Sequence, residues 1–210
     1  RRYYPVADNE RMITHVMRDA EQPIALAHLY MKRDVKPTSV RSSERYQQEI
    51  YEHDLICLML NERLSKQQSG AKAPFTAASV KDGKFLIVQT KKAFSLSVSC
   101  KRDQIEAGLS AAVGLLEQAR QWGFTTGELT RAKGILRTKA ERCNNQRGQL
   151  ANHHYVKQCL DHYLYGEPIL STAEELHVRR KFDAELTLAD VNTAIKELVT
   201  DRNQVLLLYA

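Results

Sequence analysis

The sequence is poor in residues that break secondary structure and has no long apolar segment. It contains 9 Gly and 5 Pro among 210 residues, too few for a collagen-like or low-complexity chain. The longest apolar run, Leu55 to Leu60, is far shorter than the about 20 residues that cross a bilayer as a helix. Hydrophobic residues make up 43% and charged residues 27%, which predicts a globular protein with a substantial core and no membrane span.

Motifs for metal binding and catalysis are also missing. Glycine-rich phosphate loops and G-x-S-x-G elbows do not occur, and no histidine begins H-x-x-E-H or its reverse, the spacings that bring two imidazoles to one zinc ion. The nearest substitute is His154, Cys159 and His162 on one predicted helix, where His154 is offset from the face that the other two share. We therefore predict no catalytic residue, no metal ligand and no cofactor in this segment.

The four cysteines do not form a recognisable framework. Cys57, Cys100, Cys143 and Cys159 include no C-x-x-C pair and lie within apolar patterns, so free buried thiols are expected. The even number is compatible with disulfides if the protein is exported, but the spacing does not assign them.

The net charge of +6 is compatible with an anionic partner. However, the basic residues are scattered, with short clusters only at Lys91-Lys92 and at residues 179–181. A nucleic-acid module normally groups its arginines with stacking aromatics. Solvated surface is favoured over nucleic-acid binding, and the latter is kept as a third hypothesis.

The first half of the chain reads as strands around one long helix. Strands are predicted at 12–16, 24–32, 75–80, 85–90 and 94–100, and a helix is predicted at 42–67, from their periodicity. Asp82-Gly83 predicts a two-residue hairpin turn because both residues tolerate positive φ. Ser95, Ser97 and Ser99 alternate with apolar residues, which predicts one buried and one wetter face.

The second half reads as helices followed by a strand. Asp103 is predicted to cap a helix that ends at Gly123, and another helix spans 149–164. Capping boxes are expected at Thr125/Glu128, Ser171/Glu174 and Thr187/Asp190. With a last strand at 205–209, the order of elements predicts an α+β fold, an antiparallel or mixed sheet with helices packed on one face. A single domain over 1–210 is expected. Its Arg1-Arg2 opening and its apolar last strand suggest a piece of a longer chain.

Several stretches resemble the second, non-catalytic domain of insulinase/pitrilysin-type zinc metallopeptidases, especially the PqqL-like bacterial proteases. The stretches are Met17–Glu21, Leu58–Leu64 followed by Ala73-Pro74-Phe75, Gly123–Lys133, Thr187–Val191 and Asn203–Tyr209. Gly123–Lys133 is similar to a recurrent "GFT..EL.RAK" helix start. Together they follow the family's order over nearly the whole chain.

The resemblance implies a LuxS/MPP-like metallohydrolase fold and a supporting role. In this family zinc lies in a partner domain that carries H-x-x-E-H and a distal Glu, and extended peptides add to that domain as a strand. The expected partners are the catalytic domain of the same chain and unfolded peptides or small proteins; a homo-oligomer is compatible with this picture. A bacterial periplasmic location is suggested by the resemblance alone.

Two residues are candidates for the wall of the peptide chamber, Arg63 and Phe75. In the family's substrate-clamping domain an Arg and a Tyr hold the substrate backbone. Here that Arg aligns near Gln68 or Ser69, and the Tyr aligns with Phe75. Arg63 matches a family helix position, but a helix-surface or interdomain ion-pair role is favoured for it, and Phe75 begins an apolar strand. The alternative function is a domain of a catalytically inactive relative that serves as an assembly scaffold.

Overall fold

The computed structural model describes residues 4–19, 21–70 and 72–209, and the chain divides into two compact units. Unit 1 takes the described residues of Arg1–Val35, Ile56–Phe124 and Asn192–Ala210, and unit 2 takes Lys36–Leu55 and Thr125–Val191. The single domain expected from the sequence stays a prediction, and the two units are described separately.

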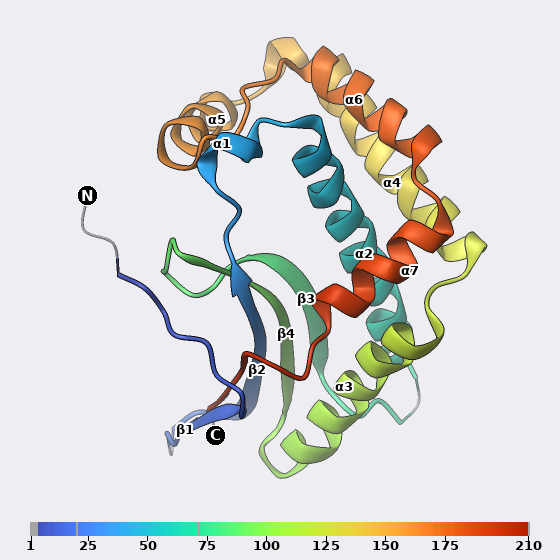
Figure 1. The fold of residues 1–210 in the computed structure, drawn as a ribbon. Coiled ribbons are helices and arrows are strands. Elements are labelled where there is room, and N and C mark those ends of the chain that lie inside the picture. The colour runs from blue at the N-terminus through green and yellow to red at the C-terminus, as the bar shows by residue number, and fades with distance from the viewer. Residues whose placement is uncertain (1–3, 20, 71, 210) are drawn as a thin grey trace. The chain divides into compact units, whose positions relative to one another are not determined.

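Unit 1 is built on a five-stranded mixed sheet of order β1-β5-β2-β4-β3 (Figure 1). β1 pairs with β5 in parallel, and the other neighbours are antiparallel. The strands are β1 (Ile13–Met17), β2 (Ile24–Asp34), β3 (Ala77–Lys84), β4 (Lys91–Lys101) and β5 (Gln204–Tyr209). The α+β class predicted from the sequence is therefore confirmed.

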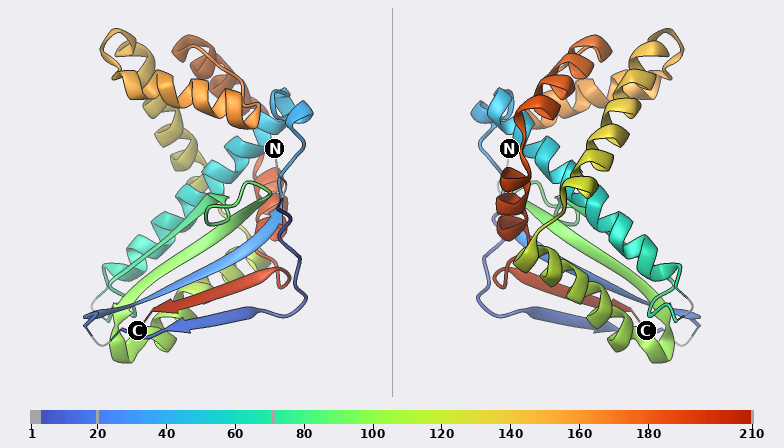
Figure 2. Two further views of the ribbon diagram at one scale, coloured as in Figure 1. Left: turned by 90° about the vertical axis from the view of Figure 1, so that its left-hand side faces the viewer. Right: turned by 90° about the vertical axis from the view of Figure 1, so that its right-hand side faces the viewer.

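Helices cover one face of this sheet. Figure 2 shows the sheet from its uncovered side in the left view and α3 (Ile105–Trp122) and the unit 1 part of α2 (Glu44–Gln68) in front of it in the right view. Asn61 of α2 fixes this packing, because its side chain accepts from the Val80 amide at 2.8 Å and donates to the Val80 carbonyl at 3.0 Å. The end of α7 (Leu188–Leu198) adds Ile195, which is fully buried.

Alternation along β2 and β4 creates the core. Ala25, Ala27, Leu29 and Met31 pair with Cys100, Val98, Leu96 and Phe94, and all eight are at most 6% exposed. These side chains face the unit 1 part of α2, where no residue from Ile56 to Leu64 is exposed. The wetter face predicted for the three serines is confirmed for Ser97 and Ser99, which are half-buried, whereas Ser95 is 3% exposed.

The predicted hairpin turn at Asp82-Gly83 is wrong. Both residues lie within β3, where Asp82 pairs with Phe94 and Gly83 with Ala93, and the connection follows at 85–90. The predicted strand at 85–90 is accordingly a loop, with Leu86 at φ 51°. Asp82 belongs to the strand because Arg33 on β2 donates to its carboxylate at 2.5 Å, a long-range contact that local turn preference does not register.

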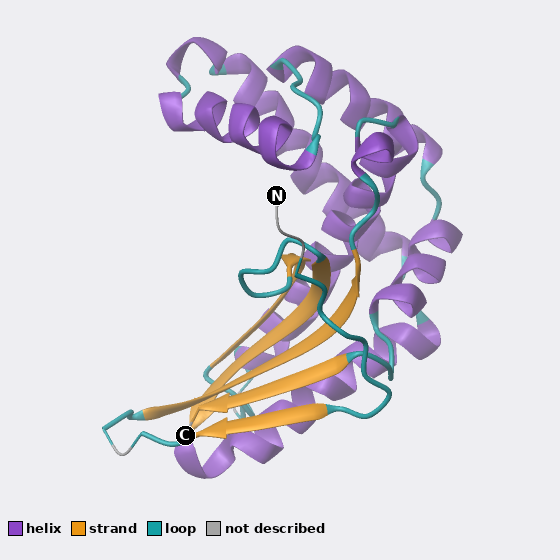
Figure 3. Cartoon of the chain, turned by 60° about the vertical axis from the view of Figure 1, so that its left-hand side comes forward, coloured by secondary structure: helices purple, strands orange, loops and turns teal. Residues whose placement is uncertain are grey.

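Unit 2 is helical. It contains the start of α2, α1 (Thr38–Arg41), α4 (Thr126–Asn145), α5 (Asn152–Tyr165), α6 (Thr172–Glu185) and the start of α7, all helices in Figure 3. The capping boxes at Thr125/Glu128 and Ser171/Glu174 are confirmed, and Thr187 and Asp190 make the same reciprocal bonds. Asp103 is not a cap: it lies in a 3-10 turn (Arg102–Gln104) that leads from β4 into α3, and Gln104 is the residue before the helix.

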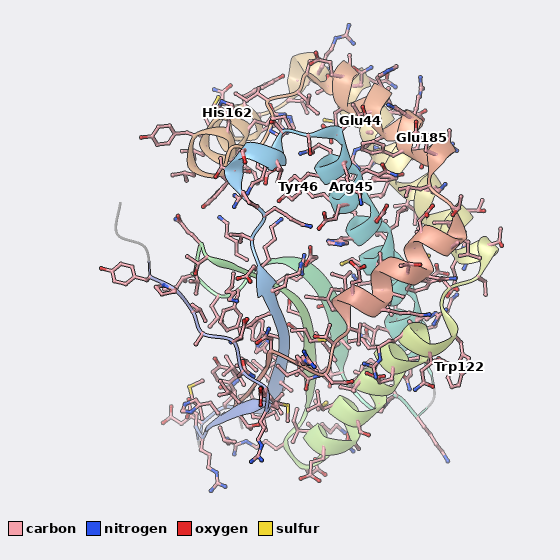
Figure 4. All side chains as sticks on the ribbon, in the orientation of Figure 1. Glu44, Arg45, Tyr46, Trp122, His162 and Glu185 are labelled. Atoms are coloured by element: carbon pink, nitrogen blue, oxygen red, sulfur yellow. The ribbon has the colours of Figure 1, made fainter. Side chains whose placement is uncertain are left out.

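Polar contacts join the helices of unit 2. The Tyr51 hydroxyl donates to Asp183 Oδ1 at 2.5 Å, and burial followed by this bond raises the pKa of Tyr51. Lys133 Nζ donates to the Asp183 and Leu186 carbonyls, both at 2.6 Å, which satisfies carbonyls at the end of α6. Lys181 on α6 bonds to Glu44 and lies 3.9 Å from Glu185; both acids are labelled in Figure 4.

The close approach of α3 to β4 depends on Gly108. A Cβ at this position would lie 2.2 Å from Cys100 Sγ and 2.8 Å from the Pro74 carbonyl oxygen. Cys100 is fully buried, and the Pro74 atom belongs to the backbone, so neither atom can move aside easily. The missing side chain therefore sets the distance between helix and sheet.

We predict that Gly108→Ala destabilises the protein although alanine favours helices. Overpacking of a core costs about 1–3 kcal/mol, which exceeds the helix preference of about 1 kcal/mol. Gly114→Ala on the same helix is the matched control, because a Cβ there meets nothing within 4 Å, and it should stabilise slightly. Denaturant unfolding of both variants tests this, and an increase in stability for Gly108→Ala would contradict the packing described.

Candidate functional site

The face of the unit 1 sheet opposite to α2 and α3 is the candidate functional site, and we call it the open face. Its residues follow from the strand register and form three rows across the sheet. In the order β1, β5, β2, β4, β3 the rows are Ile13-Val205-Tyr30-Ser95-Lys81, His15-Leu207-His28-Ser97-Ser79 and Met17-Tyr209-Leu26-Ser99-Ala77.

The two halves of the open face differ in chemistry. On β1, β5 and β2 the rows are mainly apolar or aromatic, whereas on β4 and β3 they are mainly serines. β1 is exposed along its whole length, with Ile13 at 51% and Met17 at 36%. Exposed apolar side chains grouped beside polar ones are typical of surfaces that contact another protein segment.

His28 lies at the centre of the open face, where the two halves meet. Its Nδ1 is 2.9 Å from Ser97 Oγ, and its ring stacks on Tyr30 at 6.2 Å and meets the Tyr209 ring edge-on at 5.9 Å. Burial, and secondly the positive charge of Lys81, lowers the pKa of His28. Burial, and secondly electrostatic repulsion from Tyr209, raises the pKa of Tyr30. Both shifts favour the neutral form of the side chain, so this part of the open face is uncharged near neutral pH.

The contact between His28 and Ser97 does not by itself make a nucleophile. A catalytic serine needs a base that a third group orients, and donors for an oxyanion. No hydrogen bond from the His28 ring to a carboxylate is present within the described residues, and the further ring neighbours of His28 are aromatic. The arrangement is suited to contact with a polypeptide.

One end of the open face is covered by the N-terminal segment and the 85–90 loop. Phe85, Ala93 and Val205 form a small buried cluster against which Val6 and Val88 pack. Two buried lysines tie the segment down: Lys91 Nζ lies 2.6 Å from Asp8 and 2.8 Å from Asp34, and Lys32 Nζ donates to the Ala7 carbonyl at 2.8 Å. The rows that contain His28 and Tyr209 lie beyond this cover.

The edge of the sheet next to the open face is short. β1 pairs with β5 on one side, and on its other side no strand lies among the described residues. An edge strand presents main-chain donors and acceptors that another polypeptide can use. The open face and this edge together offer side-chain and main-chain contacts.

Arg63 and Phe75, the two residues predicted for the chamber wall, contact the helical side of unit 1. Arg63 Nη2 donates to the Gly123 carbonyl at 2.9 Å, and its guanidinium lies 4.9 Å from the centre of the Phe124 ring. Phe75 is 3% exposed and lies against Gly108 of α3. The structure does not bring the two together on the open face, and their role in a chamber stays a prediction.

The described His, Cys, Asp and Glu side chains are not arranged as a zinc site. Among the described residues, no group of three or more His, Cys, Asp or Glu side chains could hold a metal ion. His162 Nδ1 lies 2.8 Å from the Glu167 carbonyl oxygen, and Cys159 is exposed. Cys159 was predicted to be buried but is exposed, because α5 buries none of its residues. All four cysteines are free.

In the described part of the chain no helix is long and apolar enough to cross a membrane.

Sequence reasoning missed His28, Tyr30 and Tyr209 as neighbours. The alternation in β2 and β4 does assign each residue to a face, but it does not say which residues face each other. Pairing of β2 with both β4 and β5 joins positions about 70 and about 180 residues apart, and no local pattern fixes such a register.

We predict that His28 titrates below the ordinary value of 6.5. The unfolded chain then takes up this proton first, so stability falls as the pH drops below about 6.5 and levels off once folded His28 is protonated. His28→Gln should remove this contribution. NMR titration of the imidazole and unfolding at several pH values test it, and a pKa at or above 6.5 would refute the burial of the ring.

Comparisons with known proteins agree on the fold. No protein-family model and no curated protein sequence matches the chain. Among solved structures, the chain is similar over its full length to 23% of the periplasmic protease PqqL from Escherichia coli, with a TM-score of 0.84 and 17% identity.

Two further structures are similar. One is a predicted insulinase family protease from Yersinia pestis, with a TM-score of 0.79, 13% identity, and coverage of 98% of this chain and 44% of that one. The other is a peptidase M16 inactive domain from Pseudomonas fluorescens, with a TM-score of 0.67, 15% identity, and coverage of 97% and 44%. The chain thus spans less than half of each relative, and its structure is similar to one domain of insulinase-type (M16) peptidases.

Proposed function

We propose that the chain is the non-catalytic domain of a zinc metalloendopeptidase of the insulinase type. In this proposal it packs on the zinc-carrying domain of the same parent protein and lines the chamber that receives unfolded peptides. The parent hydrolyses peptides, and the zinc lies in the other domain. The observation that carries the proposal is the similarity of the whole chain to only 23% of a protease chain.

Two features of the chain favour the role of a non-catalytic domain beside a zinc-carrying one. Its sequence contains no H-x-x-E-H or reversed motif, so the two imidazoles that the family's zinc needs do not come from one helix here. The open face is a mixed apolar and hydroxyl surface with no charge at its centre, and such a surface can contact extended peptides of many sequences.

The open face is the surface through which this domain would act. Met17 and Tyr209 lie in one of its rows, next to the free edge of β1. An apolar residue of a peptide or of the neighbouring domain would be placed against them, while main-chain groups reach the edge. Arg63 and Phe75 then support the domain from its helical side.

We predict that the 210-residue chain alone does not hydrolyse an unstructured peptide, whereas the parent protein does so in a chelator-sensitive manner. Met17→Asp in the parent should weaken peptide use about tenfold, the equivalent of about 1.4 kcal/mol, because it places a charge among apolar side chains. Trp122→Asp is the control, since Trp122 is 73% exposed at the end of α3, on the helical side of the sheet (Figure 4).

Three outcomes would contradict the proposal. Chelator-sensitive hydrolysis by the chain alone would show that it carries its own site. An unchanged rate for a folded Met17→Asp parent would remove the open face from the chamber. A parent that assembles with partners but never hydrolyses peptides would favour the inactive scaffold.

A further inference from the structure

α5 in unit 2 presents its apolar side to solvent, the reverse of the usual arrangement of a surface helix. None of its 14 residues is buried. Successive residues of an α-helix turn by about 100°, so five exposed apolar side chains share an arc of about 140°. No Lys, Arg, Asp or Glu of α5 falls within this arc. We call the five residues the α5 stripe: Tyr155, Val156, Cys159, Leu160 and Tyr163.

The opposite side of α5 is polar and is held by its own unit. His154, Gln158 and Asp161 are half-buried there. The Gln158 side chain donates to the Leu170 carbonyl at 3.0 Å, and Asp161 accepts from Lys157 along the helix. A surface helix normally buries its apolar side and exposes its polar side. The reversed orientation of α5 therefore leaves an apolar surface available for another partner.

The α5 stripe has the composition of the centre of an interface. Tyr163 is 83% exposed, Val156 55% and Leu160 51%. Tyrosine among apolar neighbours, with charged residues kept outside, is typical of the buried core of protein contacts. Covering the stripe would remove roughly 500 Å² of side-chain surface from water, given that one aromatic side chain accounts for about 150–250 Å² when buried.

This area favours a domain of the same parent chain over a separate protein. A stable interface between independent chains needs about 800 Å² on each partner, which is more than the α5 stripe offers to a second copy. A domain on the same chain is present at an effective concentration of the order of millimolar. A smaller apolar contact therefore suffices to hold it in place.

A lipid surface is disfavoured as the occupant. Helices that lie on membranes carry several lysines or arginines on their polar side. α5 contains one such residue, Lys157, and this lysine bonds to Asp161.

The relatives contain the additional chain that such a contact requires. In the Yersinia pestis and Pseudomonas fluorescens structures the matched part is 44% of the chain. More than half of each relative therefore lies outside the matched part, which is enough for a second domain of comparable size.

We propose that the α5 stripe is the surface on which the zinc-carrying domain of the parent protein packs. The inference deepens the proposed function and rests on it. Tyr163, the most exposed member of the stripe, inserts its ring into an apolar pocket of that domain, and a polar group at the pocket meets its hydroxyl. The open face belongs to unit 1 and stays available for the peptide.

Cys159 lies within the α5 stripe and serves as a native probe of what covers it. Its thiol is exposed, so a maleimide should modify it readily in the 210-residue chain. In the parent the reaction should be about tenfold slower, because a thiol reacts only when it is accessible. Gln121→Cys on α3, which is also exposed, is the control and should react equally in both proteins. Mass spectrometry of the labelled peptides gives each rate, and equal rates for Cys159 would overturn the proposal.

Leu160→Asp separates the domain contact from stability. In the 210-residue chain this side chain is about half exposed, so the melting temperature should stay nearly unchanged. In the parent the new charge would be buried in the contact, and labelling of Cys159 should become about tenfold faster as the contact opens. Ile135→Asp is the matched control, since Ile135 is 54% exposed on α4 of the same unit, and it should leave the labelling of Cys159 unchanged. A folded Leu160→Asp parent with unchanged labelling would contradict the proposal.

A cross-link identifies the occupant. In the parent, a short thiol-to-amine reagent attached to Cys159 should join it to the domain that carries H-x-x-E-H. A cross-link to a different domain would overturn the proposal. Protection of Cys159 that grows with the concentration of the 210-residue chain would overturn it in favour of a second copy. Protection that requires a bound peptide would place the stripe in the chamber and would also overturn it.

The same experiments distinguish this inference from the proposed function. A parent that hydrolyses peptides while Cys159 stays fully reactive retains the proposed function and removes the α5 contact. A parent that shows the cross-link but never hydrolyses peptides retains the contact and removes the proposed function.

Discussion

β2 and β4 pair over eleven residues each, from Ile24 opposite Lys101 to Asp34 opposite Lys91, and unit 1 is organised around this ladder. Apolar residues point to one side of both strands and are buried on the side that α2 and α3 cover. The other sides of the same strands carry His28, Tyr30 and a row of serines. One register therefore sets both the core and the open face, and a shift by one residue would exchange them.

The division between a packed face and an open face gives the proposed role a physical basis, because one side of the sheet is stabilised by helices while the other is left for contact with a polypeptide. Gly108 lets α3 approach β4 closely, and Arg63 holds the turn that follows α3, so the helical side is fixed. The open face then offers half-buried aromatic and apolar side chains beside a short edge strand. Similarity to single domains of insulinase-type peptidases, at 13–17% identity, is consistent with a fold kept by such packing while the sequence changes.

Features that depend on near neighbours could be predicted from the sequence. The capping boxes at Thr125/Glu128 and Ser171/Glu174 were predictable because both partners lie within one helical turn, and the faces of β2 and β4 followed from alternation. Features that depend on distant partners could not be. Asp82-Gly83 has the composition of a turn, yet Arg33 and the β4 register hold it in a strand. His28 meets Ser97 and Tyr209 only because three strands align.

The central claim is that the open face lines the chamber in which the parent protein receives its peptide. Hydroxyl-radical labelling of the chelator-treated parent, with and without an unstructured peptide, tests it most directly, because Met17, Tyr209 and Trp122 are side chains that hydroxyl radicals oxidise readily when exposed. The account predicts that the peptide decreases the labelling of Met17 and Tyr209, while Trp122 on the helical side is labelled equally in both samples. Equal labelling of Met17 and Tyr209 with and without a bound peptide would contradict it.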